Sequence, residues 1–210
     1  MKRRIFVFFL LMAISVAFAK EVTVSVRAGE HWKEKRGPQF AVWLEDENGT
    51  FLRTLYITAR ASKRSWIFSP KEGRPESLPV WYHASKNQTA KKPKKSSGAE
   101  KSGEILDAVT GATPKGDIIF KTELGDAPCR IRAEFNTSFD YNESYTKKNS
   151  GVNGQPSVVY GADIPADFSS GEIVLSFLGT GALDGKDGSI HEETPGLTTA
   201  MEIVKTVVVE

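Results

Sequence analysis

The chain has 210 residues, with 28 Lys and Arg against 26 Asp and Glu and a formal net charge of +2. This near balance gives no general argument for nucleic-acid binding, which requires a concentrated basic face, and we expect no nucleic-acid partner. The length suits one domain or two small ones. Cys129 is the single cysteine, so an internal disulfide is impossible and the fold must rest on a hydrophobic core.

Residues 1–19 have the pattern of a cleavable secretory signal peptide. Three basic residues precede an apolar run, and Ala17-Phe18-Ala19 supplies the small residues that signal peptidases accept. The run of about 14 residues is shorter than the roughly 20 that span a bilayer, so a retained N-terminal anchor is the lesser alternative. We expect cleavage near Ala19, a location in the periplasm or extracellular space, and no membrane insertion afterwards.

Cleavage would leave residues 20–210 as one domain. It would remove three of the 28 basic residues and leave 25 against 26 acidic ones, a formal charge of −1. Strand signals dominate this domain, beginning with the alternation of apolar and polar residues from Val22 to Arg27. Asn48-Gly49 tolerates the positive φ angles of a tight turn, which predicts a hairpin between strands at 40–44 and 51–57.

Further strands are expected at 117–123, 130–135, 157–161, 172–177 and 202–209. Short strands separated by Gly, Asn and Asp predict an all-β fold, an antiparallel β-sandwich of immunoglobulin-like type with long polar loops. Cys129 alternates with Ile131, Ala133 and Phe135, which indicates a buried small hydrophobe rather than a reactive thiol.

Two stretches have little strand character. Residues 70–83 could hold a helix of a turn or two, limited by their three prolines. Residues 84–103 are rich in lysine and almost without apolar side chains, which predicts a loop insertion. That insertion is either simply solvated or a patch for an anionic partner or membrane surface.

The segment from Tyr141 to Gln155 is too long for a passive turn. It is rich in Asn, Ser, Lys and Gly, which no strand pattern accommodates. Its aromatic and amide side chains suggest a packed or binding loop, and the candidate binding residues are Tyr141, Tyr145, Asn153 and Gln155.

The sharpest chemical lead is the stretch Asp107-Ala108-Val109-Thr110-Gly111-Ala112-Thr113. It resembles the acceptor motif of bacterial FMN transferases, Asp-x-x-Thr/Ser-Gly-Ala-Thr/Ser. The resemblance implies that Thr113 receives FMN through a phosphoester, with recognition residues Asp107, Thr110, Gly111 and Ala112. Small residues in an exposed loop suit entry into another enzyme's cleft.

A plain connecting loop is the alternative reading of this stretch. Residues 109–116 would then lead into the strand near Asp117, with their Gly and Pro residues setting the turn. Pro114-Lys115 stands where a further hydroxyl often follows the motif. No aromatic cluster adjoins it in sequence, although Trp66, Trp81 and Tyr82 could approach it in space.

The sequence assigns no metal site and no catalytic residue. No two of His31, His83 and His191 have ligand spacing on one element. The segment 184–189 resembles a calcium loop only vaguely, because its oxygen ligands are out of register. Ser189 lies near His191 without a nucleophile elbow. The pattern favours a protein that is not an enzyme in its own right, and a hydrolase or metalloenzyme ranks last.

Several stretches together resemble an uncharacterised family of predicted periplasmic proteins, described only as a domain of unknown function. These stretches are Ala41–Asp46 with its hairpin, Asp107–Pro114, Phe135–Asn142, Asn153–Ser157, Gly179–Ala182 and Thr198–Ala200. Members are often encoded near FMN transferases and PepSY-type membrane reductases. The resemblance therefore implies an FMN transferase and a membrane-bound reductase as partners, in flavin-linked electron transfer or metal assimilation.

Two hypotheses of different class follow. The first is an extracytoplasmic accessory protein of flavin-linked electron transfer, with FMN held covalently on Thr113. The second is a non-catalytic binding module without a cofactor, which docks a partner protein or a metal-loaded ligand through residues 141–155.

Overall fold

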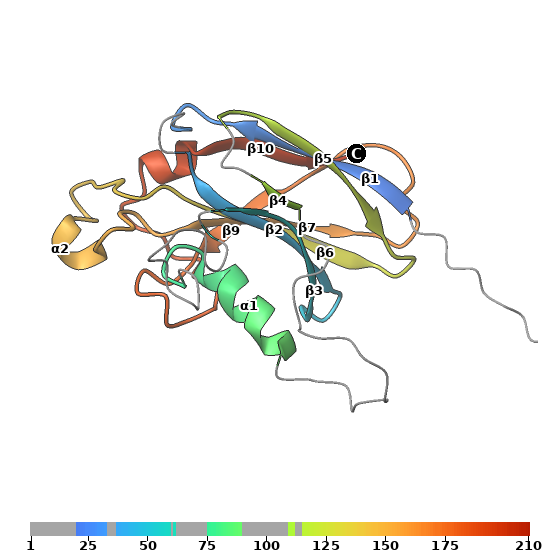
Figure 1. Ribbon diagram of the computed structural model, residues 1–210, viewed down its shortest axis with the longest axis horizontal. Coiled ribbons are helices and arrows are strands. Elements are labelled where there is room, and N and C mark those ends of the chain that lie inside the picture. Colours follow the sequence, from blue (N-terminus) through green and yellow to red (C-terminus); the bar gives the residue numbers. More distant parts are fainter. Residues whose placement is uncertain (1–19, 33–36, 60, 62–74, 90–108, 112–114) are drawn as a thin grey trace, which may run out of the picture.

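Two β-sheets stack face to face in the computed structural model, which describes residues 20–32, 37–59, 61, 75–89, 109–111 and 115–210 (Figure 1). The predicted signal at 1–19 lies outside these residues. The four-stranded sheet has the order β5 (Ile118–Leu124), β1 (Lys20–Ala28), β10 (Val204–Val209) and β8 (Ile173–Val174).

The six-stranded sheet has the order β4 (Val109–Gly111), β3 (Phe51–Thr58), β2 (Gln39–Asp46), β6 (Cys129–Asn136), β7 (Val158–Ile164) and β9 (Ser176–Thr180). Every pairing in both sheets is antiparallel except that of β3 with β4. The predicted all-β sandwich is thereby confirmed, whereas the immunoglobulin-like type stays a prediction.

The main core lies between the two sheets. Alternate residues of β1 face the alternate residues of β2 and β6, as the period-2 pattern predicts. Val24, Val26, Phe40 and Phe135 are fully buried there, and the Phe40 ring stacks on Phe135 at 5.1 Å between centroids. Cys129 belongs to the same cluster, which confirms that it is buried.

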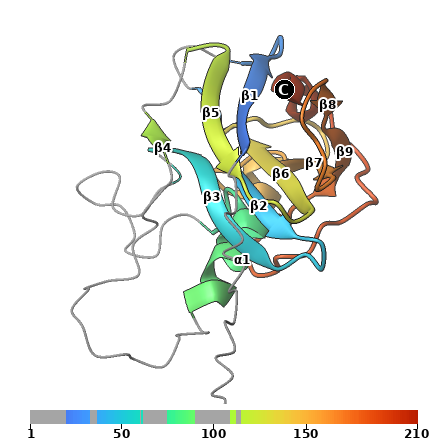
Figure 2. The same cartoon turned by 90° about the vertical axis from the view of Figure 1, so that its right-hand side faces the viewer.

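A second core covers the outer face of the six-stranded sheet. Helix α1 (Pro79–Thr89) packs there, on the side facing away from β1 and β10 (Figure 2). Trp81 of the helix is buried with Trp43 of β2, and the Trp81 indole Nε1 donates to Thr54 Oγ1 at 2.9 Å. Since both faces of β2 are covered, its sequence is continuously apolar from Phe40 to Leu44 instead of alternating.

Three predictions of local structure were wrong. The helix has eleven residues, not the expected turn or two. Pro79 occupies its first position, where a backbone N–H has no acceptor within the helix, so the proline does not shorten it. It extends through residues 84–89, which the sequence assigns to the lysine-rich loop; residues 90–103 lie outside the described part. The short strand β4 was not expected at all.

The third error concerns the strand expected at 172–177. It divides at Leu175 into β8 and β9, which join different sheets. Two short helices complete the described elements, namely α2 (Lys147–Ser150) and the 3-10 helix η2 (Thr199–Glu202). Among the described residues, no helix has the length and apolar character to cross a bilayer.

Candidate functional site

The long connection between β6 and β7, residues 137–157, forms the most elaborate end of the sandwich and contains α2 (Figure 1). We call it the β6–β7 loop. It starts at the sheet end where β2 begins, because Gln39 pairs with Asn136. The residues predicted as a binding loop all belong to it.

Asp140 is the centre of a buried polar network in this loop. Its carboxylate is 5% exposed and accepts hydrogen bonds at 2.8 Å from the Gln155 side-chain amide and from the Thr199 hydroxyl. His31, from the chain just after β1, places Nε2 at 2.9 Å from Asp140 Oδ1. This contact does not have the geometry of a hydrogen bond, so it is a close approach of the imidazole nitrogen to the carboxylate oxygen.

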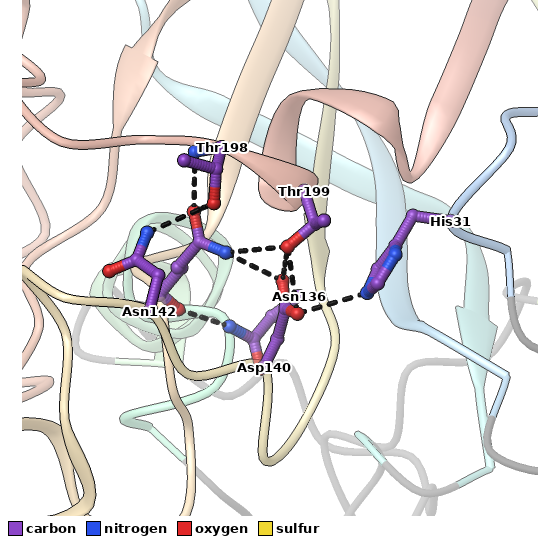
Figure 3. Close-up of polar contacts among 7 residues, drawn as sticks. His31, Asn136, Asp140, Asn142, Thr198 and Thr199 are labelled. Carbon is purple, nitrogen blue, oxygen red and sulfur yellow. Dashed lines mark hydrogen bonds and ion pairs between the residues drawn. The ribbon is translucent and has the colours of Figure 1, made fainter.

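Gln155 uses nearly all of its hydrogen-bonding groups in the same network. Its side-chain oxygen accepts from Thr198 N at 2.7 Å, and its backbone carbonyl accepts from Asn136 Nδ2 at 2.9 Å. Its backbone N–H donates to the Asp140 carbonyl at 2.9 Å. Figure 3 shows Thr199 and His31 meeting Asp140 from separate segments, which adjoin β10 and β1, so the network joins the β6–β7 loop to the four-stranded sheet.

Gly154 allows the backbone of the loop to lie close to the backbone of Asp140. It adopts φ +74°, in the left-handed region that favours glycine, and pairs with Asp140 in an isolated parallel bridge. A Cβ at this position would lie 2.5 Å from both the N and the O of Asp140. The stretch Asn153–Ser157 therefore needs glycine at its second position.

Three buried side-chain oxygens near this network make no hydrogen bond within the described part of the chain. They are Gln39 Oε1, Asn136 Oδ1 and Thr137 Oγ1. Gln39 and Asn136 lie directly opposite each other on β2 and β6. This end of the sheet therefore has hydrogen-bonding capacity that the described residues leave unused.

Glu134 is a second buried polar centre, on the outer face of β6. It is fully buried and caps the N-terminus of α1, since its carboxylate accepts from Trp81 N at 2.8 Å and Val80 N at 3.3 Å. Ser157 Oγ also donates to it at 2.6 Å. Loss of solvation raises the pKa of Glu134 to about 7, although these hydrogen bonds oppose the rise.

The predicted binding residues divide into two pairs. Asn153 and Gln155 are 4% and 1% exposed, so they hold the loop together from within. Tyr141 and Tyr145 are half-buried, and their hydroxyls donate to the carbonyls of Gly151 at 2.7 Å and Pro195 at 2.9 Å. Only the tyrosines could touch a partner directly.

Tyr145 also lines a shallow cavity of about 300 Å³ together with Gly181, His191 and Glu193. The cavity is open, and both polar and apolar residues line it. No three His, Cys, Asp or Glu side chains of the described residues are grouped to hold a metal ion.

The three histidines lie in separate environments. His31 contacts Asp140, the His83 ring lies 2.9 Å from the Gly185 carbonyl oxygen, and His191 lies 3.1 Å from Asp187. Each histidine ring therefore contacts a different residue of the described part of the chain.

Only part of the FMN acceptor motif is described. Val109, Thr110 and Gly111 form β4, the edge strand that pairs with Tyr56 to Thr58 of β3. Asp107, Ala112 and Thr113 lie outside the described residues. Because β4 runs parallel to β3, its chain leaves the sheet at the end where the β6–β7 loop begins.

Trp81 and Tyr82 pack in the core beneath α1, at 4% and 6% exposure. As placed, neither can receive a flavin ring. Trp66, the third aromatic considered, lies outside the described residues.

The sequence missed Asp140, Glu134 and Thr199 as site residues. The stretches Phe135–Asn142, Asn153–Ser157 and Thr198–Ala200 carry part of the family resemblance, and the structure brings them together around Asp140. The resemblance of these three stretches was the one sequence signal that could have pointed to the site. The local sequence does not indicate which polar residues of separate stretches will meet.

Fold and site together define an all-β sandwich with a helix on one outer face and a polar network at one end. The comparisons with known proteins found no match for this chain among protein-family models, curated proteins or solved structures. Its function is therefore argued from its own residues.

Proposed function

We propose that this protein is an extracytoplasmic accessory protein of flavin-linked electron transfer that carries FMN covalently on Thr113. The observation that carries the proposal is the acceptor motif at residues 107–113, whose described part is a sheet-edge strand. A sheet edge is accessible to another protein, and Gly111 is the last motif residue paired in the sheet.

The position of the acceptor threonine relative to the sheet supports this attachment. The acceptor threonine follows the last paired residue by two positions, so the transferase would not have to break the long β2–β3 or β2–β6 pairings to reach it. The threonine hydroxyl would displace AMP from FAD, forming the FMN phosphoester as the pyrophosphate bond breaks. Bound FMN would supply one- and two-electron redox chemistry that the side chains lack.

Intact mass spectrometry after co-production with an active FMN transferase tests the proposal. Wild-type protein should gain the mass of FMN less one water, and Thr113→Ala should gain nothing. Thr50→Ala, which removes an exposed hydroxyl from the β2–β3 hairpin, should be modified as wild type. An unmodified wild-type mass beside a modified control substrate of the same transferase would reject the carrier function.

A second function, a binding module without a cofactor, is favoured by the β6–β7 loop. Its interior is fixed by the Asp140 network while its outer surface retains two tyrosines. This loop would dock a partner whether or not Thr113 is modified. Loss of function in Tyr141→Ala with a silent Thr113→Ala would favour this second function over the first.

A further inference from the structure

The tip of the β6–β7 loop, residues 139–152, exposes two apolar side chains beside its exposed polar ones. Ser150 and the adjoining Asn153 are buried, whereas Phe139 and Val152 are 49% and 44% exposed. Exposed apolar side chains that lie next to each other, unlike singly scattered ones, are one mark of an interaction surface.

The backbone of Phe139 strengthens this argument. Phe139 is the one described non-glycine residue with positive φ, at +64°, a conformation that a bulky side chain adopts rarely and at a cost. Its N–H donates to the Val152 carbonyl at 2.9 Å, which brings the two exposed side chains to neighbouring positions. Its ring meets Tyr141 edge-on, with centroids 6.4 Å apart.

Hydrogen bonds inside the tip keep it in this shape. Asn149 accepts from Thr146 N at 2.7 Å and donates to the Ser144 carbonyl at 2.9 Å, which fixes the start of α2. Asn142 Nδ2 donates to the Gly196 carbonyl at 2.8 Å and so anchors the tip on the neighbouring segment. The apolar side chains are therefore presented by a pre-formed support, which reduces the entropy lost on binding.

The exposed charged residues of the tip itself are two lysines and one glutamate. Lys147 and Lys148 of α2 are exposed, and Glu143 is the one exposed acidic residue of the tip. Asp140 is buried and its carboxylate is already satisfied by Gln155 and Thr199. In Figure 1, α2 projects at one end of the molecule, so the tip is convex.

We infer that this tip docks on the surface of an anionic phospholipid bilayer. Phe139 and Val152 enter the interface between headgroups and acyl chains, while Lys147 and Lys148 contact anionic headgroups. A convex tip with few apolar residues suits a bilayer better than a protein surface, which would bury on the order of 800 Å² per partner. The inference extends the binding function of the loop and does not depend on FMN.

Co-sedimentation of the purified protein with phosphatidylglycerol-containing vesicles tests this inference, with pure phosphatidylcholine vesicles for comparison. Wild-type protein should bind the anionic vesicles at low salt and dissociate at about 0.5 M NaCl. The double variant Lys147→Glu/Lys148→Glu should lose about tenfold or more in partition coefficient. Phe139→Asn, which tolerates the same φ, combined with Val152→Ser should lose a similar factor.

Matched variants separate the tip from other surfaces. Val174→Ser removes a 53%-exposed apolar side chain from β8 and should bind as wild type. Alanine at Lys91, Lys92, Lys94 and Lys95 should reduce binding far less than the tip variants. The inference is overturned if wild type binds no anionic vesicle, or if only the residue 91–95 variant loses binding. Urea unfolding of each variant checks that it is folded, so that a loss of vesicle binding is not a loss of structure.

Discussion

Asp140 and Gln155 are hydrogen-bonded to each other twice. The Gln155 backbone N–H donates to the Asp140 carbonyl at 2.9 Å, and the Gln155 side chain donates to the Asp140 carboxylate at 2.8 Å. These two hydrogen bonds close the β6–β7 loop at its base. The tip beyond them is therefore a closed unit with its own shape.

Asp140→Ala should destabilise the protein by about 2–4 kcal/mol, because it leaves the buried amide of Gln155 and the hydroxyl of Thr199 without their acceptor. Urea unfolding gives the free energy of unfolding. Asp163→Ala is the matched control, because its carboxylate is 79% exposed and forms a surface ion pair with Arg130 at 2.8 Å. It should change stability by less than about 1 kcal/mol. Equal losses in the two variants would contradict a central role for Asp140.

Gly154→Ala should also be strongly destabilising, by about 2 kcal/mol or more, since it combines a positive φ with a Cβ too close to the Asp140 backbone. Gly151→Ala separates these two effects. Gly151 has φ +59° and ψ −128° but nothing within 4 Å of its added Cβ, so its loss should come from backbone conformation alone and be smaller than that of Gly154→Ala. Thermal unfolding of both variants measures the difference, and similar melting temperatures would show that the close contact is relieved cheaply.

Glu134 should make stability depend on pH. Its pKa is about 7 in the folded protein against an ordinary value of 4.5 for a solvated glutamate, so the folded protein binds more protons than the unfolded chain between these values. The free energy of unfolding should therefore fall by about 3 kcal/mol as the pH rises from 4.5 to above 7. Urea unfolding at several pH values measures this slope.

Glu134→Gln should remove most of the slope contributed by this residue. The variant cannot ionise, and its amide nitrogen faces a helix N–H, so it should be less stable than wild type at pH 5. Glu21→Gln, which alters an exposed ion pair with Lys121, serves as the control and should retain the wild-type slope. An unchanged slope in Glu134→Gln would mean that another group titrates.

Cys129 should react slowly with thiol reagents in the folded protein. It is 7% exposed, and burial raises the pKa of its thiol, so little thiolate is available. Labelling by iodoacetamide at pH 8 should proceed at least about a hundredfold faster in 6 M guanidinium chloride than in buffer. Mass spectrometry follows the reaction, and rapid labelling of native protein would contradict the buried position.

The sequence alone determined most of the strands, the β2–β3 hairpin and the burial of Cys129. These features depend on local patterns, since alternation places every second side chain on the core face and Asn48-Gly49 permits the hairpin turn. The acceptor motif is also a property of the sequence, and its modification stays a prediction.

Tertiary structure decided the features that depend on distant partners. Helix α1 reaches eleven residues because its apolar side chains pack on the outer face of the six-stranded sheet, a face that no local pattern reveals. The strand at 173–180 divides because Leu175 N donates to the Val207 carbonyl while the chain passes from one sheet to the other.

The Asp140 network was beyond sequence prediction for the same reason. His31 and Thr199 are separated from Asp140 by 109 and 59 residues along the chain, and only the stacking of the two sheets brings them to one carboxylate. Polar residues carry no periodic signal that identifies their partners. The sequence thus determined the strands, and the packing of the sheets decided which polar side chains meet.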